Sequence, residues 1–157
     1  TLRSNTMIIE YHRVHMNAHP PSRSNPSDAG LDVYFSPKEP KSVTIQPGES
    51  AILSTGLKFG VPHGYMLEVK NRSSIAAMRS LVVGACVVDS GYDGELFVNL
   101  HNIGTKEQVI EPHAKIAQVV MVPVVSFRAM ETSNPDLYGW YPITISDRGD
   151  GALGSTG

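Results

Sequence analysis

The sequence has little of several things, and each shortage excludes a class of protein. It holds one cysteine, Cys86, among 157 residues, so neither an internal disulfide nor a cysteine-based zinc cluster can form. No apolar run approaches the ~20 residues of a membrane-spanning helix, and no signal-peptide core is visible. Neither sign of charge prevails, because the formal net charge is −2, which argues against binding to nucleic acid or to a membrane surface. We therefore expect a soluble protein of the cytoplasm, or of the host-cell interior if the source is viral.

What the sequence does contain is typical of one globular domain. Hydrophobic residues make up 41% and charged residues 18%, and a chain of this length can bury a core without disulfides or metals. Residues 1–6 precede Met7 and are expected to be a cloning remnant. We assign residues 7–147 to a β domain. Residues 148–157 are rich in glycine and poor in anchoring apolar groups, which predicts a mobile C-terminal arm.

Short β patterns with turn signals between them dominate the chain. They fall at residues 7–14, 31–35, 42–45, 50–53, 57–61, 65–70, 81–88, 95–102 and 116–125. Only residues 73–79 have helix-like composition. Many short strands at this spacing predict an all-β, single-domain, jelly-roll-like barrel or sandwich with one short helix.

One predicted hairpin carries an acid where its first strand ends. The segment VVDSGYDGEL covers residues 87–96, with Asp89 at the end of the strand and Tyr92 three residues later. Gly91 and Gly94 supply turn chemistry. A lone aspartate in a turn is most often simply solvated, so other segments must decide whether this one is functional.

Four further segments carry polar groups suited to an anionic ligand. Asp32 follows the turn at Gly30, and residues 71–74 place an arginine and two serines at the start of the predicted helix. Ser73 or Ser74 is expected to cap that helix, although free N–H groups beside arginine also suit a phosphate. Gln118 offers an amide on a strand. The arm has Arg148 at its base and hydroxyl groups near its end.

Five segments in this order resemble the trimeric all-β dUTP pyrophosphatases, or dUTPases: DAGLDV, NRSS, VVDSGYDGEL, KIAQ and RGDGALGSTG. The resemblance implies jelly-roll-like subunits in a homotrimer, with active sites shared between subunits. It also implies hydrolysis of dUTP to dUMP and pyrophosphate with Mg²⁺, which limits uracil incorporation into DNA and supplies dUMP for dTTP synthesis.

The resemblance also implies a role for each matching residue. Asp89 corresponds to the general base that activates a water, and Asp32 to the acid that holds Mg²⁺ through water. The residues implied to bind substrate are Arg72, Ser73, Ser74 and Gln118 for the phosphates, Tyr92 for the deoxyribose, the backbone of Val83, Gly84, Ala85 and Val88 for uracil, and Arg148, Leu153, Gly154, Ser155 and Thr156 in the closing arm.

Four positions depart from the family pattern. Leu153 stands where a phenylalanine usually stacks on the base, a contact worth ~1–3 kcal/mol. Asp93 is expected to place an extra negative charge near the site. Asn71 stands where the family usually has glycine or proline, and Cys86 where glycine is frequent. We expect activity to survive with a raised KM.

Two other functions remain open on the sequence alone. A dCTP deaminase shares the implied fold and an Arg-Ser-Ser segment, although the Asp89 hairpin and the arm match the pyrophosphatases better. A regulatory protein that binds nucleotide and contacts a protein partner would keep the same fold. The sequence identifies no such partner.

Overall fold

The computed structural model describes residues 7–139. Within them lie eleven strands and one helix, and the β unit ends at Ser126. The strands are β1 (Tyr11–Arg13), β2 (Leu31–Tyr34), β3 (Val43–Ile45), β4 (Ser50–Ser54), β5 (Leu57–Phe59), β6 (Tyr65–Lys70), β7 (Leu81–Val83), β8 (Val87–Val88), β9 (Phe97–Asn102), β10 (Gln108–Ile110) and β11 (Lys115–Pro123). None of the helices in this part of the chain has the length and apolar character to cross a membrane.

A four-stranded antiparallel sheet forms one side of the β unit, in the order β2-β11-β6-β8. Strand β6 shows why these residues form strands, because Leu67 and Val69 are buried while Glu68 and Lys70 between and after them are not. This alternation is what a half-buried strand requires. Asp32, Gln118 and Lys70 are cross-strand partners in one row over β2, β11 and β6.

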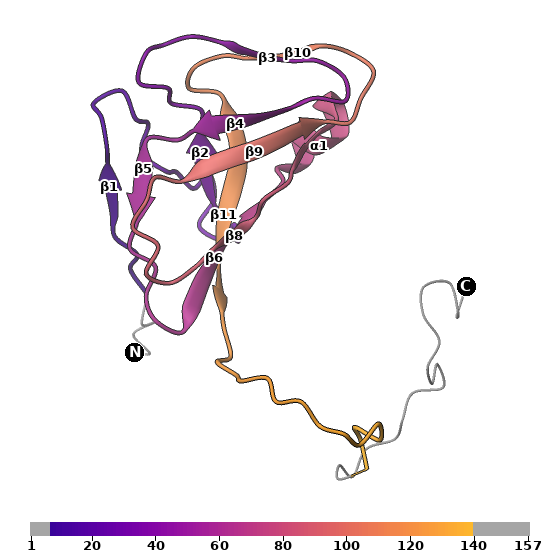
Figure 1. Ribbon diagram of the computed structural model, residues 1–157. Helices are drawn as coiled ribbons and strands as arrows, with labels where there is room; N and C mark the ends of the chain where they lie inside the picture. Colours follow the sequence, from indigo (N-terminus) through magenta and orange to yellow (C-terminus); the bar gives the residue numbers. More distant parts are fainter. Residues whose placement is uncertain (1–6, 140–157) are drawn as a thin grey trace. The chain divides into compact units, whose positions relative to one another are not determined.

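A three-stranded sheet, β4-β9-β7, packs against the first sheet. Two small sheets, β1-β5 and β3-β10, complete the β unit (Figure 1). Apolar residues of both larger sheets form one core: Val33, Leu67 and Val119 from the first, and Leu53, Val98 and Leu100 from the second. The expectation of an all-β sandwich with one short helix is thereby met.

Helix α1 (Ser73–Arg79) occupies the predicted residues and contacts β7. The predicted serine cap is wrong, since the N-cap residue is Arg72 and no side chain caps the helix. Arg72 has extended backbone angles, φ −88° and ψ 131°, so both serines fall inside the first helical turn. Their exposed hydroxyls do not accept a capping hydrogen bond from the helix backbone.

The strand predicted over residues 81–88 is divided in two. β7 pairs with β9 and β8 pairs with β6, so the chain crosses from one sheet to the other at residues 84–86. Strand β10 was not predicted from the sequence. It is three residues long and pairs with β3, which precedes it by 63–67 positions: Gln108 pairs with Ile45, and Ile110 with Val43.

Residues 127–139 belong to a second unit. Within residues 127–139 there is neither helix nor strand, and local hydrogen bonds such as Asp136 N–H to Asn134 Oδ1, 2.9 Å, shape the chain. The proposed boundary at residue 147 and the arm at 148–157 lie outside the described residues.

Candidate functional site

A cavity of about 280 Å³ lies along strand β8. Ala85, Cys86, Val87 and Val88 form one wall, and the remaining lining comes from Val69, Asp89, Tyr92, Glu95, Leu96 and Phe97. Among the described residues β8 is the last strand of its sheet and pairs only with β6. Its outer backbone edge is therefore available for a ligand to pair with, as an added strand would.

Asp89 lies at the mouth of this cavity, where β8 ends and the chain turns. Its carbonyl oxygen accepts a hydrogen bond from Tyr92 N–H at 3.2 Å, and the turn passes through Gly91 at φ +84°. The Ser90 hydroxyl donates to the Val61 carbonyl at 3.1 Å, which ties the turn to the chain after β5. Asp89 also lines a second cavity, of about 290 Å³, beside His63. The exposed carboxylate is thus held on a fixed turn between two hollows.

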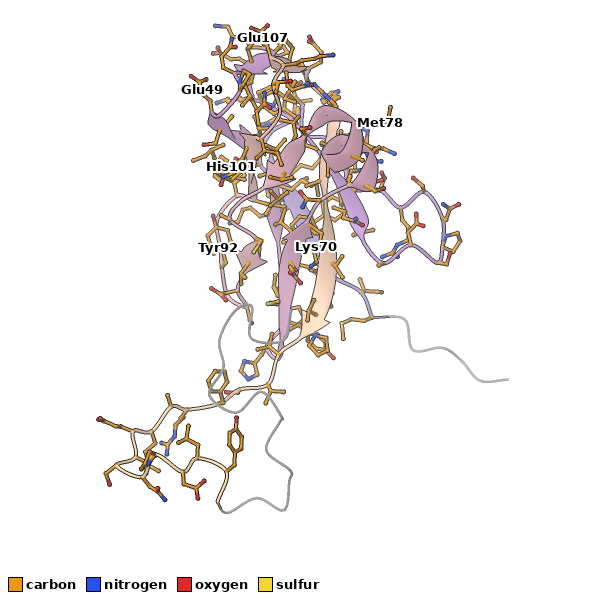
Figure 2. The ribbon with its side chains drawn as sticks, turned by 90° about the vertical axis from the view of Figure 1, so that its right-hand side faces the viewer. Glu49, Lys70, Met78, Tyr92, His101 and Glu107 are labelled. Atoms are coloured by element: carbon orange, nitrogen blue, oxygen red, sulfur yellow. The ribbon has the colours of Figure 1, made fainter. Side chains whose placement is uncertain are left out.

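The Tyr92 ring is held by the backbone of its own turn. Its hydroxyl donates to the Glu95 carbonyl at 2.8 Å. Gly94 makes this position possible, because a Cβ at residue 94 would overlap the Tyr92 hydroxyl and ring. Tyr92 remains 46% exposed and lines the cavity; Figure 2 labels its position on the β unit.

Asp93 does not add a free negative charge to this cavity, contrary to the expectation from the sequence. Its carboxylate pairs with Lys58 Nζ at 2.8 Å, and both residues line a different hollow near β1. The hydrogen bond from the Lys58 ammonium holds the pKa of Asp93 below its ordinary value of 3.8, and the ammonium's charge adds to the effect. The acid is therefore neutralised by its neighbour.

A second group of predicted residues meets around Asp32. Arg72 Nε donates to Asp32 Oδ1 at 3.0 Å, and Lys115 Nζ lies 3.4 Å from Oδ2. The Asp32 side chain is 15% exposed and the Arg72 side chain 24%. Gln118 Nε2 donates to the Asn71 carbonyl at 2.9 Å, which places the amide beside Arg72. Lys115 was missed by the sequence analysis, although it opens the KIAQ segment that was singled out.

The two groups lie toward opposite ends of β6. Leu67 pairs with Val88, and the antiparallel register puts Asp89 opposite Met66, near the Tyr65 end of the strand, whereas Arg72 follows Lys70 at the other end. Leu67 and Arg72 are five residues apart, which corresponds to about 16 Å along an extended chain at ~3.3 Å per residue. The structure therefore brings together Asp32, Arg72 and Gln118, and separately Asp89 and Tyr92, but not the two sets.

The backbone predicted to read a base is partly engaged already. Val83 N–H donates to Asn71 Oδ1 at 2.7 Å, and Gly84 N–H donates to the Asn99 carbonyl at 2.8 Å. Ala85 and Val88 line the cavity, whereas Val83 and Gly84 do not. The arm residues Arg148, Leu153, Gly154 and Ser155 lie outside the described residues, so their roles stay predictions.

The family model for dUTPase matches residues 16–157 of this sequence. The chain belongs to the dUTPase family. A deoxyuridine 5'-triphosphate nucleotidohydrolase of Chlamydia muridarum is 33% identical over 139 residues, covering 87% of this chain and 90% of that protein. A protein of the same name from Burkholderia cenocepacia is 36% identical over 140 residues, covering 87% of this chain and 88% of the relative.

Solved dUTPase structures share the fold. A Staphylococcus bacteriophage 80alpha dUTPase variant with dUpNHpp superimposes with a TM-score of 0.77 at 23% identity, covering 98% of this chain and 99% of that one. A dUTPase variant from phage phi11 of S. aureus, described for its coordination of a structural Mg(II) ion, gives 0.74 at 22% identity over 82% of this chain and 98% of the other. These findings confirm the dUTPase family, the all-β jelly-roll fold and the enzyme class, a dUTP diphosphatase.

Proposed function

We propose that this dUTPase hydrolyses dUTP to dUMP and pyrophosphate by in-line attack of water on the α-phosphorus. The observation that carries the proposal is the position of Asp89, a fixed and exposed carboxylate at the mouth of the cavity along β8. With the base in that cavity, the phosphates on the 5' carbon of its sugar would lie toward Asp89. Asp89 then takes a proton from the attacking water as the bond from the α-phosphorus to the pyrophosphate oxygen breaks, a role worth ~10²–10⁴ in rate.

The Asp32 group suits the triphosphate. Arg72 and Lys115 carry positive charge, and the exposed Ser73 and Ser74 hydroxyls and the Gln118 amide add donors to phosphate oxygens. Such charge neutralisation and alignment account for most phosphoryl-transfer catalysis. The proposal assigns these residues to binding and orienting the phosphates.

The residues present fit a hydrated Mg²⁺ rather than a directly coordinated one. No cluster of three histidine, cysteine or acidic side chains is placed to hold a metal among residues 7–139. Both Asp32 oxygens already contact cations, Arg72 and Lys115, which leaves lone pairs for water but opposes direct entry of a divalent ion. Asp32 would therefore hold the ion through water, as Mg²⁺ in phosphate sites favours. When bound, the ion neutralises charge on the phosphate oxygens.

Substrate selection follows from the cavity walls. The free edge of β8 offers fixed backbone donors and acceptors to the base, and a site built to pair polar edges rejects a base with the reversed pattern. The Tyr92 ring, fixed against Gly94, lies where it would exclude a ribose 2'-hydroxyl. The proposal thus favours uracil over cytosine and deoxyribose over ribose. In the cell, this reaction would keep uracil out of DNA and supply dUMP.

We also propose a homotrimer whose active sites are shared between subunits. Asp89 and Arg72 of one chain are separated by the length of β6, whereas a general base must act within ~3 Å, or one water, of the group it serves. The Arg72 that binds the phosphates served by Asp89 would then come from a neighbouring subunit.

Pyrophosphate release from dUTP, dCTP, dTTP and UTP with Mg²⁺ tests the proposal. The native protein is expected to turn over dUTP far faster than the other three nucleotides. Asp89→Asn, which keeps the side-chain shape, is expected to lose most of the rate while still binding dUpNHpp. Release of ammonia from dCTP would instead indicate the deaminase. A folded protein that binds dUpNHpp and hydrolyses none of the four nucleotides would favour the regulatory alternative.

A further inference from the structure

The cavity wall along β8 is held by hydrogen bonds at two places. At its far side, the Cys86 carbonyl accepts a hydrogen bond from Val69 N–H of β6 at 2.7 Å. At its near side, the chain leaves β7 and crosses to β8 through Gly84 and Ala85. What holds this crossing determines where the wall begins.

Asn99 of β9 holds the crossing with both its backbone and its side chain. Its carbonyl accepts from Gly84 N–H at 2.8 Å, and its side-chain Oδ1 accepts from Ala85 N–H at 3.3 Å. Its Nδ2 donates to the Ala51 carbonyl of β4 at 3.3 Å. Two successive amides of the crossing are therefore bound to one residue, which is itself tied to the next strand.

His101 fixes the orientation of that amide. Its Nε2 lies 3.0 Å from Asn99 Oδ1, the same oxygen that accepts from Ala85. Because the oxygen is an acceptor, Nε2 must carry the proton and donate. Residues two apart on a strand share a face, so Asn99 and His101 both face the crossing. Figure 2 shows His101 and Tyr92 along one side of the β unit.

Gly84 shows how closely this contact is fitted. A Cβ at residue 84 would overlap Asn99 Oδ1 and the His101 ring. Because glycine has no Cβ, the backbone at residue 84 can lie this close to both side chains. A larger residue at position 84 would therefore displace the crossing or these two side chains.

We propose that Asn99, oriented by His101, is a positioning residue that sets the base specificity of this dUTPase. It fixes Ala85, the first residue of the cavity wall, so that the free edge of β8 presents its donors and acceptors at fixed places. The inference rests on the proposed function. Asp89 is held separately, by the Ser90 hydroxyl on Val61 and by its own turn, so loss of the Asn99 contact affects base binding far more than the chemical step.

The test compares Asn99→Ala with the native protein in steady-state kinetics on dUTP and dCTP. We expect KM for dUTP to rise roughly tenfold, the scale of one or two hydrogen bonds, with kcat within about twofold. We expect the ratio of kcat/KM for dUTP over dCTP to fall. His101→Ala should show a smaller rise in KM and a smaller fall in this ratio. His101→Gln keeps a hydrogen-bond donor and should behave more like the native protein than His101→Ala does.

Val98→Ala is the matched control. Val98 is fully buried on the opposite face of the same strand, so its truncation lowers stability without touching the crossing. It should lower the melting temperature and leave the dUTP-to-dCTP ratio unchanged. A purely structural role for Asn99 would give the same result as Val98→Ala, and the proposal would then be wrong.

Direct binding of dUpNHpp separates this inference from the proposed function. If the native protein hydrolyses no dUTP yet binds dUpNHpp, the hydrolase proposal fails, and a roughly tenfold weaker Kd in Asn99→Ala still supports the positioning role. Equal Kd values for folded native and Asn99→Ala proteins overturn it. Absence of dUpNHpp binding by the native protein overturns both.

Discussion

Gly94 acts at the scale of a single residue, because its missing side chain gives the Tyr92 ring its place. The ring and hydroxyl of Tyr92 occupy the space that a Cβ at residue 94 would fill. The hydroxyl in turn donates to Glu95, so the ring is held on two sides. A sugar bound at the mouth of the cavity would meet a fixed wall.

We predict that Gly94→Ala displaces the Tyr92 ring and weakens discrimination against ribose. The preference for dUTP over UTP in kcat/KM should fall roughly tenfold, since a steric wall of this kind supplies about 1–3 kcal/mol. Gly48→Ala is the control, because Gly48 has a left-handed φ of +81° with open space around it. It should cost stability and leave the preference unchanged. An unchanged dUTP-to-UTP ratio in Gly94→Ala would contradict the assignment of Tyr92.

The Lys58–Asp93 pair gives a pH-dependent contribution with a definite sign. Lys58 lowers the pKa of Asp93 below 3.8, so the pair favours the folded state above that value, and the contribution is lost as pH falls through the lower, folded-state pKa. Because Asp93 is fully exposed, the contribution at neutral pH is small and screened by salt. In urea unfolding, the native protein should be slightly more stable than Asp93→Asn at pH 7 in low salt, and this difference should shrink as the pH falls below 3.8. A difference that grows toward acid pH would have the wrong sign.

At the scale of elements, the predictable parts are those whose signals are local. β6 (Tyr65–Lys70) and α1 (Ser73–Arg79) have the predicted bounds, because alternation and helix-forming composition lie within the segments themselves. The break between β7 and β8 lies where Gly84 meets Asn99 and His101 of the neighbouring strand β9, which no local pattern encodes. The same holds for the Asp32 group, where the acid was predicted but its partner Lys115 was not.

The junction from β6 to β7 gives a prediction that separates binding from stability. Ser74 is exposed and caps nothing, so Ser74→Ala should change the free energy of unfolding by less than ~0.5 kcal/mol while raising KM for dUTP. Asn71→Ala should instead lower the free energy of unfolding and leave KM for dUTP unchanged. Asn71 Oδ1 accepts a hydrogen bond from the Val83 amide at 2.7 Å, and losing this bond costs ~1 kcal/mol. Urea midpoints and KM values measured side by side check both. If Ser74→Ala lowered the free energy of unfolding clearly, Ser74 would cap the helix after all, contrary to the structure.

At the scale of the whole molecule, the separation of Asp89 from Arg72 sets what one subunit can do. Each group is held by contacts within its own chain: Arg72 donates a hydrogen bond to Asp32, and the Asp89 turn is tied to the Val61 carbonyl by the Ser90 hydroxyl. If subunits share their sites, each chain contributes Asp89 to one site and Arg72 to another. A monomer would then have no complete site.

Mixed trimers test this sharing directly. Asp89→Asn and Arg72→Ala should each be nearly inactive alone, since each removes one half of every site. Co-expressed, they form mixed trimers in which one site takes Asp89 from one subunit and Arg72 from another, and activity should return to roughly a quarter of native for random threefold assembly. The two proteins purified apart and mixed without exchange of subunits provide the baseline. Light scattering should show the same mass for native, single-variant and mixed samples. If the co-expressed protein is a trimer and stays as inactive as its parents, both residues serve the same site from one chain, and the β6 separation must close when nucleotide binds.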